Sequence, residues 1–171
     1  MRQEVVFATP WFSLLARRQG ESDAAQPYYC LQTADFVSVV ALDEKKRLIL
    51  VRQFRPAIGQ TALELPGGHV DEGQDPEEAA RQELWEETGY RAESWELLGC
   101  LRPDVGRLTN HLWCYWASNL TLDHAKHPEA GHEVVYYSGP MAEIVSFGLD
   151  NCYSLSGIWL AITKGKLASA G

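Results

Sequence analysis

Residues 65–90 read LPGGHVDEGQDPEEAARQELWEETGY, and they decide how the middle of the chain folds. Asp75 is a residue type that caps helix N-termini, and the proline after it suits the first helical turn. Gly89 is typical of the position just beyond a helix, where the backbone turns left-handed. Because the two ends agree, the sequence predicts one helix over Pro76–Thr88.

The predicted helix carries three carboxylates on one face, because Glu83, Glu86 and Glu87 stand at i, i+3 and i+4. Like charges on one patch repel each other, and a hard divalent cation such as Mg²⁺, which prefers carboxylate and water oxygens, would relieve that repulsion. The spacing alone is more typical of a solvated acidic surface. The metal-binding interpretation therefore depends on the residues that precede the helix.

A glycine-rich turn, Leu65–Gly68, precedes the acidic helix and lets the backbone approach an ion or a ligand closely. The turn, the loop and the helix together resemble the Nudix box, G-x5-E-x7-R-E-U-x-E-E-x-G-U, in which U is an aliphatic or bulky apolar residue. The spacing matches over the 23 residues from Gly68 to Tyr90. On this resemblance the chain is identified as a member of the Nudix hydrolase superfamily.

Two positions depart from the box, because Gln74 and Gln82 stand where the family has a Glu and an Arg. In the family these two residues are described as an ion pair that steadies the loop and the helix. Replacing both partners of a pair is much less costly than stranding one charge. We expect the two amides to face each other and to form a hydrogen bond.

The flanking residues resemble one branch of the superfamily, the ADP-ribose pyrophosphatases. The resemblance rests on Val51–Arg55 (VRQFR), on Glu64–Gly68 (ELPGG), and on Leu98–Pro103 followed by Gly106. It implies metal-dependent hydrolysis of the diphosphate bond of ADP-ribose or a related nucleoside diphosphate sugar. The products would be a nucleoside monophosphate and a sugar phosphate.

The resemblance also implies a metal site that holds two or three Mg²⁺ ions, with Mn²⁺ as a substitute. By position, Glu83 and Glu87 match the main ligands, and Glu86 matches an auxiliary ligand. The carbonyl of Gly67 matches a backbone ligand. Bound metal ions suit this reaction because they polarise the diphosphate and activate water.

The general base of this branch is often a Glu on a loop well after the box. Glu129 and Glu133 are the two candidates, and the sequence does not choose between them. Glu133 adjoins a predicted strand, so an ordinary surface acid is an equal alternative for it.

Four further residues are candidates for substrate contact. Arg52 and Arg55 would grip phosphate, although alternation along a strand with ordinary surface pairing also explains them. Arg107 follows a glycine in a turn and would contact phosphate unless it is simply solvated. Trp11 would stack on the base, and its alternative role is an apolar anchor of the N-terminal segment.

The chain is divided into an N-terminal arm, residues 1–26, and a Nudix domain, residues 27–171. Within the arm we expect a hairpin over Val5–Arg18 and a polar loop over Gly20–Gln26. We expect an α/β (α+β) fold of the Nudix type, an α/β/α sandwich around a mixed sheet. The expected elements of the domain are strands at Tyr28–Gln32, Phe36–Leu42, Leu48–Gln53, His111–Ala117 and Val134–Tyr137, a hairpin turn at Asp43–Arg47, and a second helix at Tyr153–Lys166.

Composition narrows the possible partners. The chain has 15 Lys and Arg against 23 Asp and Glu, a net charge of −8. This balance argues against binding to nucleic acid or to an anionic membrane. No apolar run reaches the length of a membrane span, and we see no export signal at the N-terminus, so we expect a cytoplasmic protein. The four cysteines form no C-x-x-C pair, so we expect them to be reduced. The arm resembles one that in this branch commonly contributes to a swapped dimer and to the partner's base pocket, and this resemblance implies a homodimer.

Two alternatives stay open. One is a Nudix hydrolase of another nucleoside-diphosphate-linked substrate, such as a dinucleotide, a coenzyme or an oxidised nucleotide. The other is a catalytically weak nucleotide-binding module, which Gln74 and Gln82 favour and which the retained carboxylates oppose.

Overall fold

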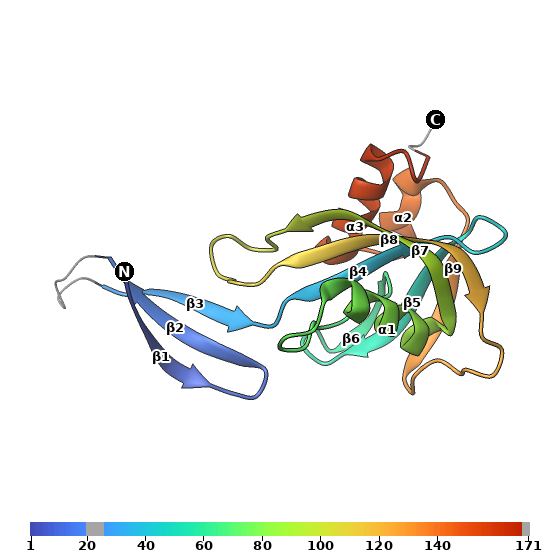
Figure 1. The fold of residues 1–171 in the computed structure, drawn as a ribbon. Helices are drawn as coiled ribbons and strands as arrows, with labels where there is room; N and C mark the ends of the chain where they lie inside the picture. Colours follow the sequence, from blue (N-terminus) through green and yellow to red (C-terminus); the bar gives the residue numbers. More distant parts are fainter. Residues whose placement is uncertain (20–25, 169–171) are drawn as a thin grey trace.

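The computed structural model describes residues 1–19 and 26–168 of the 171-residue chain. Its N-terminal part is an antiparallel sheet of three strands, which projects from the body of the molecule (Figure 1). The strands are β1 (Arg2–Ala8), β2 (Phe12–Arg18) and β3 (Tyr28–Thr33). The predicted hairpin is thus confirmed, whereas most of the predicted loop after it, residues 20–25, lies outside the described residues.

The body contains two further three-stranded sheets. One has the order β4-β8-β7, in which β4 (Phe36–Ala41) runs parallel to β8 (Leu112–Leu122), and β7 (Tyr90–Leu101) runs antiparallel to it. The other is wholly antiparallel, with β5 (Leu48–Arg55) between β6 (Gln60–Glu64) and β9 (His132–Tyr137). The first sheet is mixed, as predicted, while β6 and β7 were not among the expected strands.

The predicted turn between β4 and β5 forms, but the two strands do not pair along their length. The backbone N–H of Asp43 donates to the carbonyl of Arg47 at 3.0 Å, and Leu42 and Leu48 form an isolated antiparallel bridge, whereas β4 and β5 belong to different sheets. Five of the six β4 residues are buried. A strand with both faces covered suits a parallel pairing inside the molecule, and β4 takes β8 as its partner.

Helix α1 (Pro76–Thr88) has the predicted bounds and caps. The carboxylate of Asp75 accepts the N–H groups of Glu77 and Glu78, and Gly89 adopts the left-handed conformation with φ of 75°. The second predicted helix is α3 (Cys152–Thr163), which begins one residue earlier and ends three residues earlier than expected. A short turn η1 (Met141–Glu143) and helix α2 (Ile144–Phe147) precede it.

The core has two parts, which lie on opposite faces of β4. Val37 and Val39 belong to the cluster that contains Leu84 of α1, whereas Val40 belongs to the cluster that contains Ile158 of α3. Helices therefore cover both faces of the strands, which is the expected α/β/α arrangement (Figure 1). Across residues 1–19 and 26–168, no helix is both long and apolar enough to cross a membrane.

The start of α3 supplies a stability test. Asn151 caps the helix by accepting the N–H of Ser154 at 2.9 Å, and its amide also donates to the carbonyl of Leu63 at 3.0 Å. We expect Asn151→Ala to lower the free energy of unfolding by about 2 kcal/mol, because it removes both bonds. Asn151→Ser keeps a capping oxygen but loses the amide donor, so it should cost about half as much. Urea denaturation followed by tryptophan fluorescence measures both, and equal losses would contradict this account.

Candidate active site

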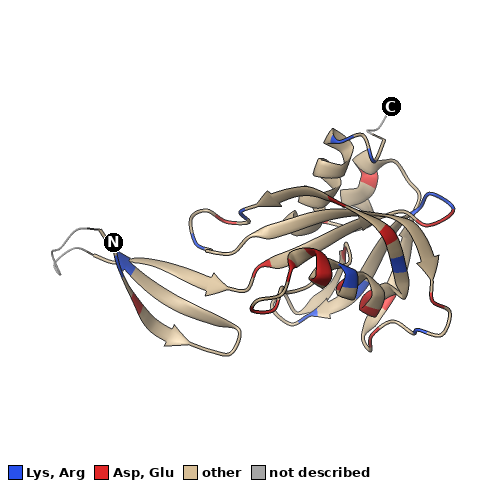
Figure 2. Ribbon diagram, viewed as in Figure 1, with Lys and Arg blue, Asp and Glu red and all other residues tan. Residues whose placement is uncertain are grey.

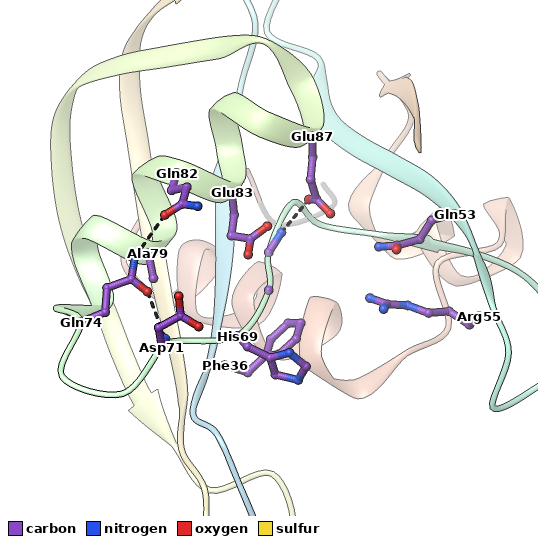
Figure 3. A pocket seen from close by; sticks show the side chains of 12 residues that line it. Phe36, Gln53, Arg55, His69, Asp71, Gln74, Ala79, Gln82, Glu83 and Glu87 are labelled. Atoms are coloured by element: carbon purple, nitrogen blue, oxygen red, sulfur yellow. Dashed lines mark hydrogen bonds between the residues drawn. The ribbon is translucent and has the colours of Figure 1, made fainter. Parts of the chain in front are cut away.

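The turn before α1 and one face of α1 line a pocket of about 250 Å³ (Figure 3). Glu83 and Glu87 reach into it from the helix, and Arg55 reaches in from β5 on the other side. The predicted site residues that line it are Gly67, Glu83, Glu87 and Arg55. The structure thus brings these four residues together, and it leaves the other predicted site residues outside the pocket lining.

The glycine-rich turn is held against β4 on one side and against α1 on the other. The N–H of Val39 donates to the Pro66 carbonyl at 2.8 Å, and the N–H of Val37 donates to the Gly68 carbonyl at 2.9 Å. Alternate carbonyls of an extended chain point to opposite sides, so the Gly67 carbonyl faces away from β4. It lies on the side of Glu87, whose Oε2 accepts the Gly67 N–H at 2.9 Å.

Both glycines of this turn are required by their surroundings. A Cβ on Gly67 would overlap the backbone carbonyl of Val37, and a Cβ on Gly68 would overlap the carboxylate of Glu83. The backbone can therefore lie against β4 only because Gly67 has no side chain, and a side chain at position 68 would displace the Glu83 carboxylate.

The two carboxyls that share the pocket both have raised pKa values. Glu87 is 3% exposed, and burial raises its pKa to about 8, with a further contribution from the charge of Glu83. Burial raises the pKa of Glu83 to about 7, and the charges of Glu86, Glu129 and Asp71 add to this effect. A cation placed between the two carboxylates would favour their ionised forms.

Arg55 is the charged group that faces these carboxylates from β5. Its guanidinium makes two hydrogen bonds to Glu64, at 2.7 and 2.6 Å, and this pairing raises the pKa of Arg55. Its positive charge also lowers the pKa of Glu83 and of Glu87, against the larger effect of burial. Glu64 thus fixes the guanidinium in a place where it can contact an anionic ligand in the pocket.

The predicted contact between the two glutamines is confirmed. Nε2 of Gln74 donates to Oε1 of Gln82 at 3.2 Å, and Oε1 of Gln74 accepts the N–H of Asp71 at 3.0 Å (Figure 3). The amide nitrogen of Gln82 donates to Oε1 of Glu86 at 3.1 Å. The amide pair therefore connects the loop to the helix without any charge, and it ties Glu86 to the helix surface outside the pocket lining.

The two candidate bases occupy different environments. The N–H of Glu129 donates to the carbonyl of Glu86 at 3.0 Å, and the charge of Glu129 contributes to the raised pKa of Glu83. Glu133 lies on β9, where it forms an ion pair of 2.7 Å with Arg52. Arg52, a candidate phosphate contact, and Glu133, a candidate base, are therefore partners of each other.

Trp11 and Arg107 lie away from the carboxylates. Trp11 is 76% exposed at the turn between β1 and β2, and it lines an adjoining pocket of about 450 Å³. That pocket shares Phe36, Arg55 and His69 with the candidate active site, so the two are continuous. Arg107 lies in the loop between β7 and β8, where its guanidinium stands over the ring of Tyr28.

His132 contacts Glu87, which the sequence did not predict. Nε2 of His132 lies 3.1 Å from Oε1 of Glu87 and 3.1 Å from Oε1 of Gln53. The contact depends on the register of β5 with β9, in which Gln53 stands opposite His132. Alternation of residues along a strand would have indicated the side to which His132 points. The strand was expected to begin at Val134, however, so His132 was not included in it.

The donor set of the pocket suits a hard divalent cation. Among the described residues, no group of three or more Asp, Glu, His or Cys side chains is arranged to hold an ion. The pocket instead offers the carboxylates of Glu83 and Glu87 and the carbonyl of Gly67. Mg²⁺ is commonly held by one or two carboxylates, with water and substrate phosphates at its other positions, so this set fits it.

The raised pKa values predict how stability depends on pH without metal. In the unfolded chain both carboxyls have the ordinary glutamate pKa of 4.5, whereas in the folded protein they have pKa values of about 7 and 8. The folded state therefore binds more protons than the unfolded state, and the free energy of unfolding should fall as the pH rises from about 5 to about 8. Urea denaturation in EDTA at several pH values measures this slope.

Two controls isolate the cause of the slope. Glu87→Gln cannot ionise at this position, so its slope should be shallower than that of the natural chain. Added Mg²⁺ favours the ionised carboxylates and should also flatten the slope. A stability that rises over this pH range in EDTA, or the same slope in Glu87→Gln, would contradict the assignment.

Two curated proteins and one solved structure illustrate what this chain is similar to. ADP-sugar pyrophosphatase of Mus musculus is 40% identical over 87 residues, which are 47% of this chain and 40% of that protein. ADP-ribose pyrophosphatase of Mycobacterium tuberculosis (strain ATCC 25618 / H37Rv) is 35% identical over 98 residues, 57% of this chain and 46% of that protein. A crystal structure of ADP compounds hydrolase shares the fold with a TM-score of 0.73 at 19% identity, over 98% of this chain and 95% of that one.

The matches to the curated proteins span less than half of the length of either relative. A family model described as the NUDIX domain covers much more of this chain and matches residues 33–146, from the end of β3 to α2. This range contains the turn, α1 and the pocket that they line. The chain therefore belongs to the NUDIX family.

Proposed function

We propose that the protein hydrolyses the diphosphate bond of ADP-ribose or a related nucleoside diphosphate sugar in a metal-dependent reaction. The observation that carries this proposal is the pair of pocket carboxylates, Glu83 and Glu87, beside a glycine turn and opposite the guanidinium of Arg55. The names of the relatives, ADP-sugar pyrophosphatase and ADP-ribose pyrophosphatase, support the choice of substrate. The products would be a nucleoside monophosphate and a sugar phosphate.

In this proposal Glu83, Glu87 and the Gly67 carbonyl hold Mg²⁺, or Mn²⁺ in its place, with two or three ions per site. Glu86 is an auxiliary ligand that would have to leave its hydrogen bond to Gln82. When bound, the metal supplies Lewis-acid polarisation of the diphosphate and a more acidic water. The contact between Glu87 and His132 fixes the orientation of this carboxylate from the side of β9.

We assign the phosphate contact to Arg55 rather than to Arg52. Arg55 lines the pocket and is fixed there by Glu64, so its free edge can face a phosphate oxygen. Arg52 is paired with Glu133 outside the pocket lining. Trp11 borders the adjoining pocket, where an exposed indole suits stacking against a base.

We assign the role of general base to Glu129. Its backbone N–H donates to the carbonyl of Glu86 at 3.0 Å, which holds Glu129 beside α1, and its charge acts on Glu83. Glu133 already accepts a hydrogen bond from Arg52, which lowers its availability as a base.

We further propose that the protein is a homodimer in which the N-terminal sheet contacts a second copy. The sheet exposes an unusual number of large apolar side chains for a monomer surface, namely Val5, Val6, Phe7, Trp11 and Phe12. Such a surface is more stable when it is covered by another apolar surface.

Removal of one metal-binding carboxylate tests the central assignment. We expect Glu87→Gln to lower kcat on ADP-ribose with Mg²⁺ by about 10³-fold or more, because the amide retains the shape but no longer holds the cation. Glu78→Gln, on the same helix but outside the pocket lining, is the matched control and should leave kcat within about twofold. Release of AMP is the readout, and a natural-like rate in Glu87→Gln would refute the metal assignment.

The choice of base is tested by a second pair of variants. Glu129→Gln should lower kcat by about 10²-fold or more, whereas Glu133→Gln should change it only slightly.

Initial rates on a panel of ADP-sugars, dinucleotides and oxidised nucleotides, with and without Mg²⁺, separate the alternatives for the substrate. Binding of ADP-ribose without any Mg²⁺-dependent turnover would favour the nucleotide-binding module instead.

A further inference from the structure

Another pocket, of about 390 Å³, lies where the N-terminal sheet meets the loop between β7 and β8. Three arginines line it: Arg17 from β2, and Arg102 and Arg107 from the loop. It shares no lining residue with the candidate active site, and none of its described lining residues is an Asp or a Glu. We call it the arginine pocket.

The arginine pocket is built by hydrogen bonds between the loop and β3. The N–H of Leu31 donates to the carbonyl of Arg107 at 2.8 Å, and the N–H of Thr109 donates to the carbonyl of Leu31 at 3.0 Å. The hydroxyl of Tyr28 donates to the carbonyl of Gly106. These bonds hold the loop arginines beside β2 and β3, so the positive charges come together as a consequence of the fold.

The three arginines differ from most others in the chain because none of them pairs with a carboxylate among the described residues. Arg17 donates from Nε to the amide oxygen of Gln3, and Arg107 donates to the Tyr28 hydroxyl at 3.3 Å, so both partners are neutral. Five other arginines form ion pairs with acids, namely Arg18, Arg47, Arg52, Arg55 and Arg81. In a chain with 23 acids and 15 bases, three guanidiniums thus gather in one place without an ion pair to any described acid. Asp104, which lies in the same loop, instead accepts the N–H of Gly106 at 2.8 Å.

We propose that the arginine pocket binds the phosphate group of a small phosphomonoester. A phosphomonoester carries close to two negative charges at neutral pH and offers three acceptor oxygens, which match several guanidinium forks. The hydroxyl of Thr109, which also lines the pocket, can add one more donor, whereas the hydroxyl of Tyr28 already donates to the Gly106 carbonyl. The volume exceeds what a phosphate alone fills and lies in the range of sites for small organic ligands.

Such a ligand would connect two parts of the molecule. It would bridge Arg17 on the N-terminal sheet to Arg102 and Arg107 on the body, and so relieve the repulsion among the three charges. Binding should therefore stabilise the position of the N-terminal sheet relative to the body. This inference does not depend on the reaction at the carboxylate pocket, because the two sites share no residue.

The test measures binding of inorganic phosphate, glycerol 3-phosphate and glycerol by titration calorimetry in EDTA, so that no metal contributes and no nucleoside can occupy the candidate active site. Inorganic phosphate and glycerol 3-phosphate should bind and glycerol should not. Arg17→Gln and Arg102→Gln should each weaken glycerol 3-phosphate binding at least about tenfold, because each removes a charged donor. Arg81→Gln changes the net charge equally but lies on α1, outside the arginine pocket, and should bind glycerol 3-phosphate as the natural chain does. Equal affinities in all three variants, or glycerol binding as tightly as glycerol 3-phosphate, would overturn the proposal.

Two further measurements keep the result distinct from unfolding and from the proposed reaction. Arg102→Lys keeps the charge but loses the planar fork, so its affinity should lie between those of the natural chain and Arg102→Gln. Thermal unfolding should show a rise in Tm on adding phosphate that exceeds the rise given by NaCl of the same ionic strength, and equal rises would refute a specific site. Hydrolysis of ADP-ribose by the natural chain is measured separately, so a natural chain that binds phosphate but hydrolyses nothing would refute the proposed function alone.

Discussion

The site depends on the burial of two like charges beside the backbone of the glycine-rich turn. Glu83 and Glu87 lie one helical turn apart, and burial raises the pKa of each well above its usual value. Such a pair is unfavourable in a metal-free protein, and it persists because Leu84 packs the helix into the core while the Gly67 N–H holds Glu87. A side chain on Gly67 would force the backbone away from Val37, and a side chain on Gly68 would displace the carboxylate of Glu83. Stability and chemistry are therefore coupled, because the bond that positions Glu87 also positions the Gly67 carbonyl.

The parts of the fold that were predictable from the sequence are those fixed by neighbours along the chain. The bounds of α1 follow from Asp75 and Gly89, and the contact between Gln74 and Gln82 follows from two departures that removed a charged pair together. The separation of β4 from β5 was not predictable, because it depends on which distant strand pairs with β4. The contacts of the β9 side chains with Glu87 and Arg52 depend in the same way on the register of β5 with β9.

Helical spacing alone does not say which of the three carboxylates line the pocket in this structure. Residues at i and i+4 differ by about 40° around a helix, whereas adjacent residues differ by about 100°. Glu83 and Glu87 therefore point the same way, while Glu86 is rotated away from Glu87 and meets the amide of Gln82. Carboxylates that share one helix face therefore need not all reach the same pocket.

The charge distribution shows how an acidic chain can still present binding sites for anions. Five of the described arginines are paired with acids, so the net charge of −8 says little about any one place on the surface. Figure 2 shows Asp and Glu gathered along α1 and the loop before it, where a divalent cation would reverse the local sign. At the junction of the N-terminal sheet and the body, three guanidiniums that form no ion pair with a described acid would give an anion site without any metal. The same overall charge thus accommodates two ways of attracting phosphate, one that requires a cation and one that the fold supplies directly.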